Sequence, residues 1–353
     1  MKNIIKTAII MLTSVSFLSS ANSGELTVTG TAKATYNIVS GQVTQGKGLG
    51  VTNEFDLGAN GELDNGWTWN YQIQMDPGNS SGSNKQTVEN DDSRLTLTSP
   101  TYGTAGIFIS EGGLDLEDMG SQSVYGRPTD VGDPSGTTDN ADVDSYSNFQ
   151  LHTPAGLLPF DTAIKYGRVT DTTVTNGSGN AVGSSLTQSA TTVGRTVDAY
   201  QIKATPITGL NIGASYVEFG DNVTATDANN TQASYAAGAT YALGAVKIGY
   251  SEGFFEPALG TPAVADAETY EQQNYSISYL VDDNLSVSYE MEKSEENYVE
   301  SSTAAIEQES SAIQAAYTMG GMTLAVSHGK YENNGYVKGT DGNQTLFALT
   351  MAF

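Results

Sequence analysis

Apolar and polar residues alternate with a period of two along most of this chain, and this pattern restricts the fold more than any other feature. Between Leu26 and Ile38 the apolar residues share one face, whereas threonine, lysine and asparagine share the other. The segments that begin at Trp67 and Leu285 repeat the arrangement. A period of two is the side-chain period of a β-strand with one apolar and one polar face. The pattern therefore predicts an all-β protein.

Gly, Asn, Asp and Pro residues divide the alternating pattern into sixteen predicted strands. These are expected near residues 25–39, 50–63, 67–77, 91–98, 104–111, 143–153, 160–169, 196–205, 209–219, 231–243, 245–254, 270–281, 285–298, 308–319, 322–332 and 343–353. Fourteen or eighteen strands also fit, because sequence-based boundaries shift by about two to four residues. Short connections alternate with long, polar ones. This layout is typical of a transmembrane β-barrel with short periplasmic turns and long extracellular loops.

A soluble β-sandwich, as in a secreted adhesin or binding protein, also produces alternating strands and is the alternative. Three features favour the barrel: an even number of strands, tyrosines near strand ends on the apolar face, and a chain that stops inside a strand. The apolar residues of that last strand are Phe347, Leu349, Met351 and Phe353.

Residues 1–23 have the features of a cleaved signal peptide. Two lysines precede an apolar stretch at residues 7–18, and residues 21–23 are small or polar. A membrane helix is the alternative, but the stretch is shorter than the roughly 20 residues that a span requires. We therefore expect an exported protein whose residues 24–353 form a single domain.

The composition excludes several classes of function. The chain has no cysteine and two histidines, which rules out disulfides, thiolate chemistry and a multi-histidine metal cage. It has 15 Lys and Arg residues against 40 Asp and Glu residues, which gives a formal net charge of -25. Loss of residues 1–23, with their two lysines and no acidic residue, makes this charge -27. Nucleic acid is not an expected partner, because its phosphates require basic residues.

Several segments resemble one protein family. They are Glu25-Leu26-Thr27-Val28-Thr29-Gly30, Ser93-Arg94-Leu95-Thr96-Leu97, Tyr102-Gly103-Thr104 and the terminal Phe353. Together with the signal peptide they resemble Gram-negative general porins of the alphaproteobacterial type, over the whole mature chain. The resemblance implies a homotrimer in the bacterial outer membrane, in contact with lipid and lipopolysaccharide. It also implies a third long loop folded into the pore, and a closing strand that the barrel-assembly machinery recognises.

In this family the third loop narrows a water-filled channel for small hydrophilic solutes, with loop acids facing basic wall residues. Here that connection runs from Gly112 to Asp142. The expected constriction residues are Asp115, Glu117, Asp118, Lys33 and Arg94, and the further lumen residues are Glu54, Asp56, Lys165, Lys203 and Lys247. The acidic excess predicts a preference for cations, because low-dielectric walls focus the field. For any single acid, the alternative is that it only keeps a loop soluble.

Two other kinds of site are weaker candidates. Asp139, Asp142 and Asp144 can bind calcium weakly, although the spaced ligand loop with its central Gly and terminal Glu is missing. No other cofactor is expected. His152 lies on a polar face, but catalysis also requires a nucleophile and an orienting partner. No enzymatic activity is expected.

Overall fold

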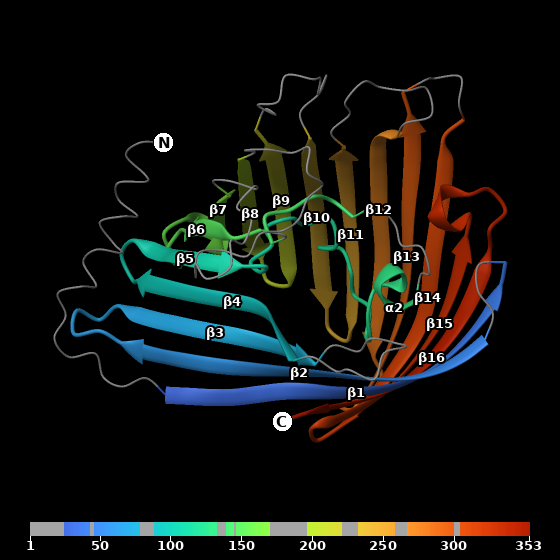
Figure 1. Cartoon of the computed structure of the whole chain (residues 1–353), viewed down its shortest axis with the longest axis horizontal. Helices are drawn as coiled ribbons and strands as arrows, with labels where there is room; N and C mark the ends of the chain where they lie inside the picture. Colours follow the sequence, from blue (N-terminus) through green and yellow to red (C-terminus); the bar gives the residue numbers. More distant parts are fainter. Residues whose placement is uncertain are drawn as a thin grey trace.

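The sixteen strands form one closed antiparallel barrel in chain order, in which β1 pairs with both β2 and β16. The computed structural model describes residues 25–42, 46–77, 88–132, 139–144, 146–169, 196–220, 232–257, 267–299 and 304–353. The predicted signal peptide lies outside these ranges. Figure 1 shows the sheet curving around an internal segment that carries α2. The fold is the predicted barrel, and the closed sheet excludes the sandwich.

The strands agree with the alternating pattern over nearly their whole length. The first eight are β1 (Glu25–Gly41), β2 (Gly46–Glu62), β3 (Thr68–Pro77), β4 (Val88–Ser99), β5 (Gly103–Ile109), β6 (Asn148–His152), β7 (Ala163–Val169) and β8 (Val197–Ile207). The others are β9 (Leu210–Phe219), β10 (Ala233–Leu243), β11 (Val246–Glu256), β12 (Ala267–Leu280), β13 (Leu285–Tyr298), β14 (Ile306–Met319), β15 (Met322–Glu332) and β16 (Gly342–Ala352). Short helical segments are α2 (Pro128–Gly132), η2 (Pro159–Asp161) and η3 (Asn334–Tyr336). No helix in the described ranges is long and apolar enough to cross a membrane.

Most of the connections at one end of the barrel are short turns, and several of them contain a glycine with positive φ. Gly244 and Gly320 have φ values of 61° and 62°, which side chains with a Cβ rarely adopt. Both chain ends of the barrel, the start of β1 and the end of β16, lie at this same end. The long connections are at the other end, which is the layout that the sequence predicted.

The closing seam joins the last residue to the first strand. Gly30 N donates to Phe353 O over 3.0 Å, and Phe353 N donates to Gly30 O over 3.1 Å. The Phe353 ring lies 5.6 Å from the ring of Phe55 on β2. A Cβ on Gly30 would approach the Phe353 ring to 2.8 Å, so the glycine makes room for it. Phe353 thus completes the hydrogen bonding of the seam and covers it.

One predicted strand is shorter than expected. The strand expected at residues 143–153 begins only at Asn148, because the residues before it form a turn in which Tyr146 N donates to Val143 O over 3.0 Å. The Asn148 side chain donates to Glu111 O and Val143 O over 3.0 and 3.1 Å, which fixes both ends of the connection. The loop between β5 and β6, here called L3, therefore spans residues 110–147.

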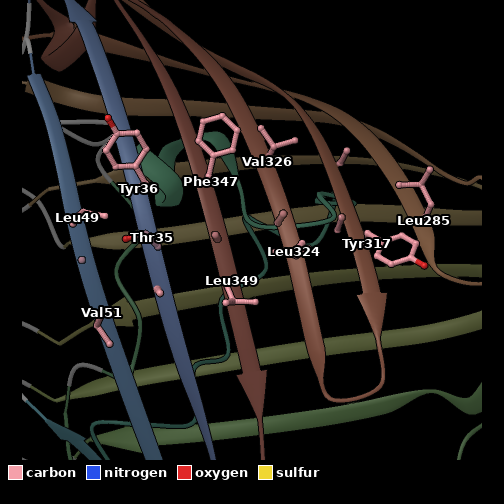
Figure 2. A pocket seen from close by; sticks show the side chains of 16 residues that line it. Thr35, Tyr36, Leu49, Val51, Leu285, Tyr317, Leu324, Val326, Phe347 and Leu349 are labelled. Carbon is pink, nitrogen blue, oxygen red and sulfur yellow. The ribbon is translucent and has the colours of Figure 1, made fainter.

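An apolar concave patch lies on the outer face of the barrel across the closing seam (Figure 2). Its side chains come from β1, β2 and β13 to β16. The main ones are Ala34, Tyr36, Leu49, Val51, Leu285, Ala315, Tyr317, Leu324, Val326, Phe347 and Leu349. Leu49 is 86% exposed and Leu324 is 49% exposed in the isolated chain. We call this surface the seam patch.

Deleting Phe353 should reduce the yield of folded barrel, because it removes two backbone hydrogen bonds and an aromatic contact from the seam. The conductance of the surviving channels should not change, since Phe353 lies outside the lumen. Heat-modifiable migration of membrane extracts measures the folded fraction. Phe55→Ala, which removes only the facing ring, is the control and should have a smaller effect. Normal assembly of the deletion variant would contradict this role.

Candidate functional site

L3 folds into the barrel and follows the inner wall from β6 to β16. Inward-facing serine and glutamine side chains hold its backbone at each step. Leu116 N donates to Ser215 Oγ over 3.0 Å, and Gly120 N donates to Ser251 Oγ over 3.1 Å. Further wall residues that bind L3 backbone atoms are Gln150, Gln201, Ser234, Ser276, Ser288, Gln314, Tyr331 and Gln344. Because buried backbone groups need partners, these contacts allow a loop to lie inside a barrel.

The loop lies very close to the wall at Gly249 of β11. A Cβ at this position would lie 1.8 Å from Gly120 O, so a larger residue cannot be placed there without displacing the loop. Gly213 and Gly238 on the neighbouring strands similarly face Met119, with 2.8 and 2.9 Å to a built Cβ. These glycines form a shallow track for the loop on β9 to β11.

Two apolar clusters anchor L3 near its ends and its tip. The first joins Leu114, Val143 and Tyr146 of the loop to Val169, Val197, Ala199, Val217 and Phe219 of the wall. The second packs Val124, Tyr125 and Val131 against Ala316, Ala325, Leu346 and Ala348. Burial of one large apolar side chain contributes about 1.5 to 3 kcal/mol. The clusters therefore add a substantial apolar term to the hydrogen bonds.

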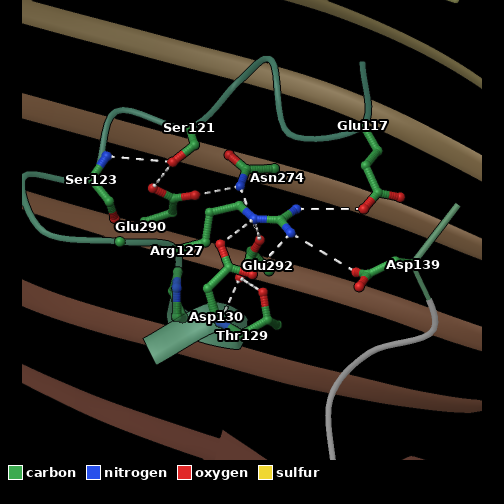
Figure 3. Close-up of polar contacts among 12 residues, drawn as sticks. Glu117, Ser121, Ser123, Arg127, Thr129, Asp130, Asp139, Asn274, Glu290 and Glu292 are labelled. Carbon is green, nitrogen blue, oxygen red and sulfur yellow. Dashed lines mark hydrogen bonds and ion pairs between the residues drawn. The ribbon is translucent and has the colours of Figure 1, made fainter. Parts of the chain in front are cut away.

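Arg127 links four separate segments (Figure 3). Its guanidinium lies 3.5 Å from Glu117 on the outgoing limb of L3 and 3.9 Å from Asp139 on the returning limb. It also contacts Asp130 of α2 at 3.0 Å and Glu292 of β13 at 3.7 Å. The Arg127 side chain is 15% exposed. The pKa of Arg127 is raised: burial lowers it, but the hydrogen bonds that Arg127 donates to Asp130 and the charges of Glu292, Asp130 and Glu117 outweigh that effect.

Three loop acids, of which Asp142 is buried and Asp115 and Glu117 are partly buried, lie where the two limbs of L3 meet. Asp115 N donates to Asp142 Oδ2 over 2.6 Å, and Asn140 N donates to Glu117 Oε2 over 2.8 Å. Burial raises the pKa of Asp115, and burial together with the charges of Asp115 and Asp139 raises that of Glu117 well above its usual value. Burial also raises the pKa of Asp142 to about 7. These carboxyl groups hold the loop in shape.

The residues expected at the constriction are therefore not equivalent. Asp115 and Glu117 take part in contacts within L3, whereas Asp118 is exposed. Lys33 of β1 lies beside the tip of L3, with Nζ 5.7 Å from the centre of the Tyr125 ring. Among the three loop acids expected at the constriction, Asp118 is thus the exposed one, and Lys33 is the wall cation beside the loop tip.

Arg94 belongs to a chain of polar contacts that leads from the wall to the stem of L3. Its guanidinium donates to Glu111 and to Gln72, and Gln72 Nε2 donates to Asp56 Oδ1 over 2.9 Å. Asp56 and Glu54 occupy alternate, inward-facing positions of β2, where they pair with Thr29 and Thr31 of β1. Arg94 is thus partly neutralised by Glu111.

The other expected lumen cations lie on a different part of the wall. Lys165, Lys203 and Lys247 are on β7, β8 and β11, the strands along which L3 runs. They share the inward register of Gly167, Gln201 and Ser251, which contact the loop. The structure therefore does not bring these three lysines together with Lys33 and Arg94.

The remaining sequence candidates have structural partners. Asp142 accepts hydrogen bonds from the backbone of Asp115 and Val143, over 2.6 Å each. His152 Nε2 lies 2.8 Å from Gln150 Oε1, and its ring lies 6.2 Å from that of Phe108. In the described part of the chain, no group of three or more His, Cys, Asp or Glu side chains is arranged to hold a metal ion.

The sequence analysis missed the role of Arg127 and of the wall serines and glutamines. Their signal was present: Ser215, Ser251, Ser276, Ser288 and Gln314 all occupy polar-face positions of the alternating pattern. However, a polar lumen requires polar side chains with or without a loop against it. Only the structure shows which of them bind L3.

Comparison with known proteins identifies the architecture. The family model described as Gram-negative porin matches residues 7–353. No curated protein sequence matches the chain. OmpF of Salmonella typhi, solved in complex with daunomycin, superposes with a TM-score of 0.65 at 13% identity, over 94% of this chain and 98% of that one. An anion-selective porin from Comamonas acidovorans gives 0.65 at 12% identity, over 94% and 100%. The trimer form of OmpT from Vibrio cholerae gives 0.62 at 12%, over 94% and 100%.

Docking of L3 should weaken as the pH rises. Asp142 keeps its proton in the docked loop up to about pH 7, whereas its ordinary pKa is 3.8. Because Asp142 holds its proton more tightly when L3 is docked, protonation of Asp142 favours docking at low pH. This contribution is lost as the pH rises from 3.8 to about 7. Glu117 acts in the same direction. Brief increases in single-channel current, which report displacement of L3, should therefore become severalfold more frequent from acidic to neutral pH.

The Asp142→Asn variant should show a smaller pH dependence, because the amide does not titrate in this range. Asp283→Asn, in an exposed turn, is the control for the loss of one acid and should behave as the unmodified protein does. A pH dependence that Asp142→Asn leaves unchanged would rule out this cause.

Proposed function

Because the chain belongs to the Gram-negative porin family and forms a closed barrel in the outer membrane, we propose that it is a diffusion channel that prefers cations. The family and the fold support a passive channel for small hydrophilic solutes. We retain the expectation that it is not an enzyme and needs no cofactor. The direction of the charge preference is the specific part of the proposal, and it rests on the residues of L3.

The observation that supports the proposed cation preference is the excess of acidic residues in L3 inside the barrel. The described residues of L3 contain eight acids, Glu111, Asp115, Glu117, Asp118, Asp130, Asp139, Asp142 and Asp144, and one base, Arg127. Arg127 is surrounded by four carboxyl groups and cannot act as a free cation. Near low-dielectric walls, each ionised carboxylate acts on a passing ion more strongly than it would in bulk water.

The fold by itself does not decide this preference, because the porin from Comamonas acidovorans is anion-selective and has a similar barrel. In this chain, two basic residues of the wall, Lys33 and Arg94, oppose the acidic loop. Lys33 faces the loop tip and Arg94 is paired with Glu111. We propose that these two cations orient dipolar solutes across the constriction without cancelling the acidic excess.

Asp118→Asn should reduce the preference for K⁺ over Cl⁻, because Asp118 is the exposed acid among the three expected at the constriction. The triple variant Asp115→Asn, Glu117→Gln and Asp118→Asn should reduce it only slightly further, because Asp115 and Glu117 contact other residues of L3 and their raised pKa values lower the charge they carry. The reversal potential in a KCl gradient measures the preference. It should also shrink as salt shortens the Debye length from about 10 Å at 0.1 M to about 3 Å at 1 M.

Asp283→Asn in the turn is the control for the loss of one charge outside the constriction. Anion preference of the unmodified protein would overturn the proposal. A reversal potential that does not respond to the triple substitution would place the selective section elsewhere in the pore.

We also propose that three copies associate through the seam patch. The trimer form of Vibrio cholerae OmpT has a similar fold, which supports self-association of such barrels. The patch is concave and apolar, and it contains small residues such as Ala34 and Ala315 that permit close approach of a second wall. The outer face of a transmembrane barrel is apolar because it faces lipid, so the concave shape and the small residues are the features that support a contact between barrels here.

Ala315→Trp should lower the proportion of trimer, because the indole would fill the space that a neighbouring barrel occupies. Ala237→Trp on β10 is a matched control: the same change faces outward on a strand remote from the seam in the barrel order. Native mass measurement in mild detergent gives the oligomeric state. Monomer alone in the unmodified protein, or equal loss of trimer in both variants, would refute the seam patch as the interface.

A further inference from the structure

Two lysines lie diagonally across from each other on the inner wall, on the neighbouring strands β7 and β8. Lys165 of β7 pairs with Gln201 of β8, and Lys203 is two residues further along the same strand. Residues in this diagonal relation lie about 7 to 8 Å apart and face the same side of the sheet. Gln201 faces the lumen, because its side chain donates to Leu114 O of L3 over 2.9 Å. Both lysines therefore face the lumen, with Lys203 one inward position nearer the periplasmic turns.

A third basic residue completes the group on the next strand. His152 of β6 pairs directly with Lys165. Its ring is held by Gln150 at 2.8 Å and by Phe108. Three adjacent strands, β6, β7 and β8, thus direct a histidine and two lysines to one area of the lumen wall. We call this group the basic recess.

Carboxylates are not paired with these lysines within the described ranges of the chain. Five other basic residues, Arg94, Arg127, Arg168, Lys293 and Lys330, each form an ion pair. Lys165 and Lys203 form no ion pair within the described ranges, and their positive charges act on each other. Two positive charges at this diagonal spacing repel each other. In a chain with so many acids, two unpaired neighbouring lysines are an arrangement that a bound anion would stabilise.

We propose that the basic recess binds small dianionic oxyanions, such as phosphate or a dicarboxylate, on the periplasmic side of L3. Two ammonium groups supply charge-assisted hydrogen bonds to oxyanion oxygens, and such bonds are roughly twice as strong as neutral ones. Lys203 is exposed and Lys165 is partly exposed, so the site opens to the water of the lumen. The recess gives oxyanions a binding step in a pore whose loop repels them. This inference goes beyond the cation preference and does not depend on it.

Inorganic phosphate tests the proposal on the full-length protein in planar bilayers. Phosphate replaces chloride on the periplasmic side at constant ionic strength, in mildly alkaline buffer. In the unmodified channel, the single-channel current should fall with a saturable dependence on phosphate. Lys165→Gln and Lys203→Gln should each raise the half-maximal phosphate concentration by about tenfold or more, the effect of losing one hydrogen bond to a charged group.

Lys247→Gln is the matched control, because Lys247 is a lumen-facing lysine on β11, three strands from Lys203. Its half-maximal concentration should stay within about twofold of the unmodified value, since it leaves both hydrogen bonds of the recess intact. The conductance of each variant in chloride alone shows that its pore is intact. Succinate should act as phosphate does, and a channel that ignores succinate would contradict the assignment to dianions.

A phosphate effect that does not saturate, or one that neither lysine substitution changes, would overturn the proposal. The reversal potential in KCl, measured on the same channels, reports the cation preference separately. Whether that measurement gives cation or anion preference, the interpretation of the phosphate result stays the same.

Discussion

The structure depends on one constraint: in a lipid bilayer every backbone N–H and C=O group must find a partner within the protein. A closed barrel meets this requirement, and here the closure is made between β1 and β16, where Phe353 exchanges two hydrogen bonds with Gly30. L3 meets the same requirement inside the lumen. Its backbone takes partners from wall side chains such as Ser215, Ser251 and Gln314.

The fold could be predicted from the sequence because the side-chain period of a strand is directly visible in the residues. Even the short turns were marked by residues such as Gly244 and Gly320, whose φ values require glycine. The start of β6 was placed too early, since Val143 keeps the alternating register of Phe149 and Leu151 but belongs to L3, where it packs with Tyr146 against the wall. A local pattern does not distinguish a strand from a loop that is packed against one.

The candidate site was predicted less completely, because it is made by segments far apart in the chain. Arg127 meets acids from both limbs of L3, from α2 and from β13, and apart from the local pair with Asp130 no spacing rule connects these positions. As a result, acids that the sequence assigned to the constriction, Asp115 and Glu117, serve to hold the loop together. Asp118 alone among the three is exposed. The charge that solutes meet is thus a property of the folded loop rather than of its composition.

The central claim is that L3 narrows the pore with Asp118 in the path of solutes, and cysteine modification of single channels tests it most directly. The chain contains no cysteine, so Asp118→Cys introduces a single thiol. A bulky thiol reagent should then cause a stepwise fall in current, and the same reagent on Asp283→Cys in the turn should cause none. If mass measurement confirmed modification at residue 118 and the current did not change, L3 would not form the narrow section.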